Sequence, residues 1–187
     1  MKFPGIQKKT HWLCCLPLFV LALQAGCSSP RTRAETARYK EHTIAELGAR
    51  LFIPDFWEVT ANQNFQLVAR GPGPSGLLTS IEYRGLEKSL KDTADKALYA
   101  TGWYDAIAAN HRDWNFISRK RSNQDPEGRF ELEGTYREGA IIFRKIGILR
   151  FRNQRIHAIY YTAPDQNIEP VRELFMEIDR RHIFEDS

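Results

Sequence analysis

The sequence has few cysteines and lacks a hydrophobic run long enough to span a membrane. Only three of the 187 residues are cysteine, and two of them, Cys14 and Cys15, lie in an apolar run over residues 12–23. That run has about a dozen residues, whereas a stable transmembrane helix needs roughly 20. Three lysines precede the run and small residues follow it, which is the order of a secretory signal. The pattern therefore favours export and cleavage over a retained transmembrane helix.

Loss of residues 1–26 changes the charge and the cysteine count of the chain. These residues contain three lysines and no acidic residue, so the formal net charge falls from +4 to +1. A net charge this small does not indicate nucleic-acid binding, and we expect no nucleic-acid partner. Cys27 becomes the only cysteine, which excludes an intramolecular disulfide. A domain without cross-links must then be stabilised by its hydrophobic core.

The sequence also lacks the motifs of common catalytic and metal sites. No serine lies in a G-x-S-x-G turn, and the triplet at residues 111–113 lacks the other motifs of a kinase. The loop at residues 71–76 contains two prolines, which removes amide donors that a phosphate-binding loop needs. The histidines occur singly, without the spacing of zinc ligands. We therefore expect a protein that is not an enzyme, with no catalytic residues, no metal and no cofactor.

The end of the signal resembles the lipobox of bacterial lipoproteins. Residues 23–27 read LQAGC, with two small residues before Cys27 and with Gln24 where that family prefers an apolar residue. The resemblance implies lipidation of Cys27 by a diacylglycerol on sulfur and an acyl chain such as palmitate on the amino group, and two or more chains anchor a protein durably. Ser28 in place of Asp implies the periplasmic leaflet of the outer membrane. The alternatives are an inner-membrane anchor or a soluble periplasmic protein.

Three segments follow from these patterns. Residues 1–26 are predicted to be the lipoprotein signal peptide. Residues 27–42 are predicted to be the lipidated cysteine and a flexible tether, because residues 28–42 are polar and charged and offer almost nothing to bury. Residues 43–187 are predicted to form a single α+β domain.

Alternating apolar residues and turn signals predict the elements of this domain. Helical spacing predicts helices over residues 89–110 and 167–182. Alternation predicts strands at residues 44–47, 50–53, 65–70, 77–84, 114–121, 129–137, 141–152 and 155–162. The order has no βαβ repeat, and tight turns join the strands of its second half. We therefore predict an antiparallel sheet of about six to seven strands with two main helices packed on it.

This order of elements resembles the PsbP/DcrB group of small domains, known from a photosystem II extrinsic subunit and from bacterial envelope lipoproteins. Residues 51–57, LFIPDFW, carry the likeness in sequence, because the group often opens with a strand that runs into Pro-x-x-Trp. The resemblance implies a PsbP/DcrB-like sandwich over residues 43–184. It implies no catalytic residues, because the group has none in common.

Large aromatic side chains are the remaining signal in the sequence. They are so numerous that they need not all be buried in one core. An exposed aromatic groove rimmed by arginine would suit a protein, peptide or lipid partner. The candidate binding surface consists of Trp57, Trp103, Tyr104, Tyr160 and Tyr161. The last two are adjacent, so we expect them to point to opposite faces of a strand.

The anchor and the missing chemistry together favour a non-enzymatic lipoprotein. It would bind or support an envelope protein assembly from the periplasmic side of the outer membrane. One alternative is a carrier of a lipid or other apolar ligand, which would require an apolar cavity of several hundred Å³. A second alternative is a hydrolase, which would require a cleft that joins a histidine to a carboxylate and a hydroxyl.

Overall fold

A computed structural model describes residues 38–63, 66–74, 76–88, 90, 92–122, 125, 128–152 and 154–185, without the side chains of residues 61–63 and 167. The described residues form ten strands, two α-helices and two short 3₁₀ helices. In chain order these are β1 (Tyr39–Ile44), η1 (Ala45–Leu47), β2 (Ala49–Pro54), β3 (Glu58–Gln63), β4 (Gln66–Pro72), β5 (Leu78–Glu87), α2 (Thr93–Ala109), β6 (Asn115–Ser122), β7 (Arg129–Glu138), β8 (Ile141–Arg152), β9 (Arg155–Pro164), η2 (Asp165–Asn167), α3 (Ile168–Arg181) and β10 (Ile183–Phe184).

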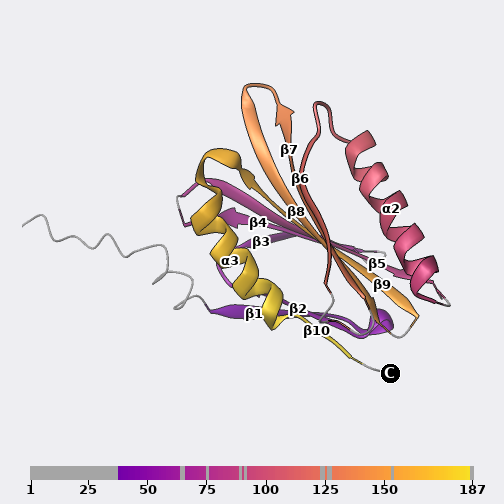
Figure 1. The fold of residues 1–187 in the computed structure, drawn as a ribbon. Helices are drawn as coiled ribbons and strands as arrows, with labels where there is room; N and C mark the ends of the chain where they lie inside the picture. The colour runs from indigo at the N-terminus through magenta and orange to yellow at the C-terminus, as the bar shows by residue number, and fades with distance from the viewer. Residues whose placement is uncertain are drawn as a thin grey trace, which may run out of the picture.

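Two antiparallel sheets organise these elements. The large sheet has seven strands in the order β3-β4-β5-β9-β8-β7-β6, and the small sheet has three in the order β1-β2-β10. The small sheet and α3 lie on one face of the large sheet, and α2 lies on the other (Figure 1). The predicted α+β architecture, an antiparallel sheet with two helices packed on it, is confirmed.

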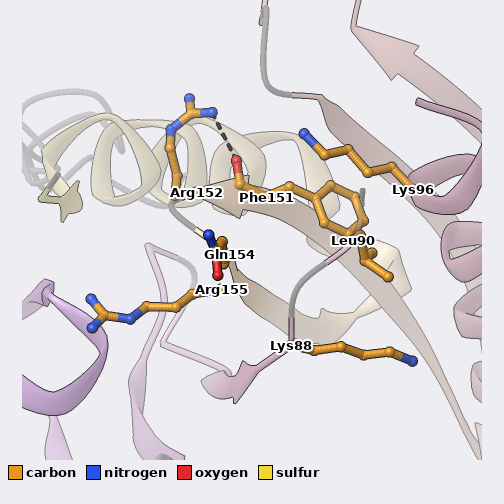
Figure 2. Close-up of a pocket in the computed structure, with 7 residues that line it drawn as sticks. All are labelled: Lys88, Leu90, Lys96, Phe151, Arg152, Gln154 and Arg155. Atoms are coloured by element: carbon orange, nitrogen blue, oxygen red, sulfur yellow. Dashed lines mark hydrogen bonds between the residues drawn. The ribbon is translucent and has the colours of Figure 1, made fainter. Parts of the chain in front are cut away.

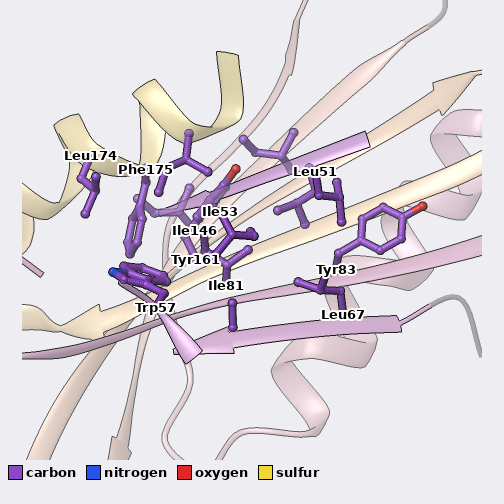
Figure 3. Close-up of a cluster of buried hydrophobic side chains, with 14 of the residues drawn as sticks. Leu51, Ile53, Trp57, Leu67, Ile81, Tyr83, Ile146, Tyr161, Leu174 and Phe175 are labelled. Atoms are coloured by element: carbon purple, nitrogen blue, oxygen red, sulfur yellow. The ribbon is translucent and has the colours of Figure 1, made fainter. Parts of the chain in front are cut away.

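The face of the large sheet toward α3 carries the larger of two hydrophobic cores. Because side chains alternate along a strand, Tyr83 of β5 and Tyr161 of β9 both point to this face. Tyr161 packs on Phe175 of α3 with ring centroids 4.8 Å apart, and Tyr83 lies at the other end of the same cluster (Figure 3). All three aromatic side chains are almost fully buried. Tight packing of this kind brings α3 and the small sheet onto one side of the molecule.

The opposite core lies under α2, and it covers only part of its face. Helix α2 packs Trp103, Tyr104 and Ile107 onto β7, β8 and β9. Gly147 of β8 admits the Trp103 ring, since a Cβ there would lie 3.0 Å from it. On the same face of β5, Glu82 is half-buried and Arg84 is exposed. The part of this face that lies beyond β9 is therefore open to solvent.

Three local predictions are corrected by the structure. Residues 39–42, predicted to belong to the tether, form most of β1, because pairing with β2 satisfies their backbone groups. Residues 45–47, predicted to be a strand, form η1 instead, and Gly48 ends it in the left-handed conformation with φ of 60°. Strands β3 and β10 were not predicted, since β3 is mostly polar and β10 has only two residues.

A buried carboxylate fixes α3 to the large sheet. Asp179 of α3 is 2% exposed. It accepts a hydrogen bond of 2.6 Å from Arg150 of β8, and its Oδ2 lies 3.2 Å from Nη1 of Arg129. The Tyr161 hydroxyl donates to its other oxygen at 3.3 Å. Removing one member would leave buried charge without a partner, which is costly.

Two buried histidines complete the α3 side. The His157 ring is hydrogen-bonded to the Tyr83 hydroxyl at 2.9 Å, and His182 accepts from the Phe52 amide at 3.1 Å. Burial, and secondarily the charge of nearby arginines, lowers the pKa of His157 to about 4 and the pKa of His182 to about 3. Both rings are therefore neutral at neutral pH.

We predict that Asp179→Asn lowers the free energy of unfolding by about 3 kcal/mol, because the buried Arg150 loses its counter-charge, whereas the half-buried Arg129 keeps its ion pair with Glu131. Urea unfolding followed by circular dichroism measures this change. Glu177→Gln on the same helix is the control. Glu177 pairs with Arg180 and Arg181 near the surface, so its loss should cost less than about 1 kcal/mol. Equal losses for the two variants would contradict the role given to Asp179.

Stability should also fall on mild acidification. The folded-state pKa values of His157 and His182 lie below the ordinary value of 6.5, so the unfolded chain binds more protons as the pH falls below that value. The stabilisation is complete above pH 6.5 and decreases by about 1.4 kcal/mol per pH unit for each histidine down to its folded pKa. Urea unfolding between pH 6.5 and 5 measures the slope. His157→Gln should remove about a third of it, because His111 on the opposite face of the sheet also has a pKa lowered to about 4. An unchanged slope would contradict this assignment.

Candidate functional site

The structure separates the five aromatic residues that were predicted to form a binding surface. Trp57 and Tyr161 belong to the core on the α3 side, where they are 5% and 1% exposed. Trp103 and Tyr104 are buried under α2, and Tyr160 is half-buried beside them. The five residues therefore do not share one surface, because hydrophobic burial takes four of them into two cores on opposite faces of the large sheet.

Trp103 and Tyr160 begin a site at the border of the open part of the sheet. The Trp103 indole donates a hydrogen bond of 2.6 Å to the Tyr160 hydroxyl. Lys145 of β8 places its Nζ 5.6 Å from the ring centroid of Tyr160 and 5.5 Å from that of Tyr136 on β7. The faces of aromatic rings attract a cation at these distances. The lysine is therefore held between two tyrosine rings from neighbouring strands.

The loop that follows α2 closes the site. His111 places Nε2 2.8 Å from Nζ of Lys145, and its ring stacks on Tyr136 with centroids 4.1 Å apart. His111 also stacks with Trp114 at 5.6 Å, and the Trp114 and Tyr136 rings lie 6.3 Å apart, so the three rings form one cluster. Trp114 lies against Gly134, where a Cβ would be 2.3 Å from the indole ring. The Lys145 site, as defined here, consists of Trp103, His111, Trp114, Tyr136, Lys145 and Tyr160.

Burial controls the protonation of this site. It lowers the pKa of Lys145, against the attraction of Glu82. Burial and the charge of Lys145 lower the pKa of His111 to about 4, so the imidazole is neutral and accepts from the lysine at neutral pH. Burial raises the pKa of Tyr136 to about 12, which keeps the phenol neutral. Lys145 is therefore the cation of a site whose other members are neutral.

The arrangement suits binding. Within the described part of the chain no carboxylate forms an ion pair with Lys145, so its charge remains available to a partner. His111, Trp114, Lys145 and Tyr160 are each half-buried, and Phe143 extends the row of rings by stacking on Tyr136 at 5.6 Å. Half-buried aromatic rings around one cation are typical of the energetic centre of a protein interface.

The described histidines do not form a catalytic relay. His111 contacts a lysine, His157 a tyrosine hydroxyl, and His182 a backbone amide, so none of these three hydrogen bonds goes to a carboxylate. In the same residues no group of three His, Cys, Asp or Glu side chains is placed to hold a metal. Cys27, the predicted lipidation site, lies outside the described residues.

Sequence reasoning missed Lys145, His111 and Tyr136. Four segments distant in the chain contribute to the site, so no local spacing indicates it. One signal was present in β8, where alternate residues 143, 145, 147, 149 and 151 read Phe, Lys, Gly, Leu and Phe. A lysine in such an apolar row predicts a charge on a buried face.

A small hollow lies at the other end of α2, with a volume of about 50 Å³. It is lined by Lys88, Leu90, Lys96, Phe151, Arg152, Gln154 and Arg155. Figure 2 shows Lys88 and Arg155 directed to opposite sides of it. The two terminal nitrogens of Arg152 each donate a hydrogen bond of 2.9 Å to the carboxylate of Asp125. Because these cations point in different directions, the hollow does not have the geometry of an anion-binding site.

Comparison with known proteins identifies the fold. No protein-family profile and no curated protein matches the sequence. Among solved structures, a Pseudomonas aeruginosa protein of unknown function matches with a TM-score of 0.57 at 12% identity, over 80% of this chain and 99% of that one. The Ran-binding protein Mog1p of Saccharomyces cerevisiae matches at 0.56 and 13%, over 80% and 96%. The cyanobacterial PsbP of Synechocystis sp. PCC 6803 matches at 0.56 and 12%, over 80% and 94%.

Identities this low establish the shared fold and nothing about activity. The PsbP-like arrangement predicted from the order of elements and from residues 51–57 is confirmed at the level of the fold. The chain has a PsbP/Mog1-like α+β fold in which α3 and the small sheet cover one face and α2 covers part of the other.

Proposed function

We propose that this protein is a lipid-anchored module of the periplasmic face of the outer membrane, and that it binds a protein partner of an envelope assembly through the Lys145 site. The observation that carries the proposal is the placement of Lys145 between Tyr136 and Tyr160 without a carboxylate partner in the described residues. A cation held by ring faces at a half-buried surface retains its charge for a ligand.

The closed packing of the cores supports binding on the outer surface. Tyr161 and Phe175 fill the space between α3 and the large sheet, and Trp103 fills the space under α2. A carrier of an apolar ligand needs a cavity of several hundred Å³. The basic hollow at the far end of α2 has about 50 Å³. These dimensions favour a binding module over the carrier considered as its alternative.

The breadth of the site favours a protein partner. Stacked rings run from Trp114 through His111 and Tyr136 to Phe143, across a loop and two strands. Ile141, at the end of β8, is 50% exposed and lies on the same face as Phe143. A broad row of rings with one cation and an apolar margin matches the composition of protein interfaces.

The anchor follows from the sequence. In the described residues no helix is long and apolar enough to cross a membrane. Residues 28–38 separate Cys27 from the first residue of β1. A flexible coil of that length has an r.m.s. end-to-end distance of about 18 Å. Such a tether would keep the Lys145 site within reach of a partner at the same membrane.

We predict that Cys27→Ala moves the protein from the membrane fraction to the soluble periplasmic fraction, because no acyl chains are then attached. Fractionation of envelopes measures the shift. Intact-mass analysis of the wild-type protein should show a chain that begins at Cys27 and carries acyl groups. Cys14→Ala is the control and should leave both results unchanged. An unmodified thiol at residue 27, or an uncut signal, would contradict the anchor.

We also predict that Lys145→Gln reduces recovery of the partner at least tenfold, since loss of a central interface cation costs more than about 1.4 kcal/mol. The measurement is crosslinking and affinity capture of the anchored protein from envelopes, with quantitative mass spectrometry. Lys88→Gln is the matched control, because Lys88 also lies over a tyrosine ring, at 5.0 Å, but at the far end of α2. Equal recovery with both variants, or turnover of a substrate by the purified protein, would contradict the proposed function.

A further inference from the structure

From Asn115 to Arg121, the outer edge of β6 is unpaired in the described structure. β6 is the last strand of the large sheet and pairs with β7 alone. Among the described residues, no backbone hydrogen bond joins residues 115–121 of β6 to any segment other than β7. An edge strand of this kind presents a row of amide and carbonyl groups to which another extended segment can pair.

The edge is long and accessible. β6 has eight residues, five of which are exposed: Asn115, Ile117, Arg119, Lys120 and Arg121. Ile117, at the register shift between Phe116 and Ser118, is 46% exposed. Basic side chains discourage edge-to-edge aggregation, but an exposed isoleucine on a long edge gives a partner an apolar contact.

Within the described residues no close ion pair joins the three consecutive cations of β6 to a carboxylate, although Lys120 lies opposite Glu131 of β7 in the register. Aromatic rings support two of them. The Arg119 guanidinium lies 4.5 Å from the ring centroid of Phe116, and that of Arg121 lies 5.7 Å from Phe130. Contact with a ring face holds an arginine in place without neutralising it. The edge therefore combines unpaired backbone groups with three exposed positive charges.

The positive charge of β6 determines which kind of extended segment can pair with its edge. If a second copy of the chain paired with β6 antiparallel about Lys120, Arg119 of one copy would face Arg121 of the other. Like charges directly opposite one another across two strands are destabilising. An extended segment rich in Glu or Asp would instead place carboxylates beside these cations while its backbone pairs with the edge.

We propose that β6 is a docking strand to which an extended acidic segment of the protein partner adds as an eighth strand of the large sheet. The inference rests on the proposed function, since it identifies the part of the partner that is recognised. β6 begins one residue after Trp114, which belongs to the Lys145 site. A segment paired with β6 therefore leads directly to the aromatic row, so that one partner contacts both.

The test uses the full-length protein in detergent and a fluorescent eight-residue peptide that alternates glutamate and valine. Fluorescence anisotropy should show saturable binding that weakens with added salt. The triple variant Arg119→Glu, Lys120→Glu, Arg121→Glu should bind the peptide at least tenfold more weakly. The matched control changes the same charge at exposed residues elsewhere: Lys40→Glu, Arg70→Glu, Lys88→Glu. The control should bind like the wild-type protein, and its circular dichroism should match that of the triple variant.

Two control peptides separate strand pairing from simple charge attraction. A peptide with lysine in place of glutamate should not bind. A peptide with alternate backbone amides N-methylated keeps its charge but loses its donors, so it should bind at least tenfold more weakly. Amide hydrogen exchange of β6 should slow only with the unmodified acidic peptide. Equal binding of the N-methylated peptide, or self-association of the chain through β6 in sedimentation, would overturn the proposal.

The outcomes for β6 and for the proposed function are distinguishable. Lys145→Gln should reduce partner capture while the short acidic peptide still binds to β6. If the peptide does not bind but capture still depends on Lys145, the docking strand is wrong and the binding module stands. If the peptide binds to β6 but capture is independent of Lys145, the docking strand stands and the Lys145 site is not the partner site.

Discussion

Both faces of the large sheet carry apolar side chains that must be buried, but the helices and the small sheet cover the two faces to different extents. Alternation along each strand sends apolar side chains to both sides, as the adjacent Tyr160 and Tyr161 illustrate. On one side α3 and the small sheet together cover the larger core. On the other side α2 alone covers three strands and ends at Ala109. The Lys145 site lies where this cover ends. The incomplete cover of one face therefore leaves the Lys145 site accessible, next to the edge strand β6.

The cations on the two faces of the large sheet contact different partners. On one face they are neutralised by carboxylates of the fold, and on the other they lie over aromatic rings and can bind an anionic partner. On the α3 side, Arg150 binds the buried carboxylate of Asp179, and Arg144 and Arg172 bind Glu133. Burial opposes ionisation of Glu133, but hydrogen bonds from Arg172 and then Arg144 lower its pKa below the usual value. On the α2 side, Lys145 and Arg119 lie over aromatic rings. A paired arginine has little to gain from a new anion, whereas a ring-supported cation keeps its charge.

The sequence predicted those elements whose pattern is local. Strands β7 to β9 alternate clearly between apolar and polar residues, and α3 carries one apolar stripe, so these elements matched their predicted positions within a few residues. Strand β1 was assigned to the tether because its residues are polar, and only pairing with β2 makes them a strand. The Lys145 site was not predictable in the same way. Trp103, Lys145 and Tyr160 come together through the order of strands in the sheet, which residue spacing does not encode.

The connection between α2 and β6 links the two surfaces assigned here. Within it, His111 and Trp114 provide two stacked rings of the Lys145 site, and β6 begins at the next residue. Asp113 adopts a φ of 57° in this turn, a left-handed conformation that aspartate tolerates better than branched residues do. That conformation redirects the chain from the helix into the edge strand while Trp114 packs against Gly134. Because one short turn sets both the position of the rings and the start of the edge, the geometry of the aromatic row and that of the docking strand are determined together.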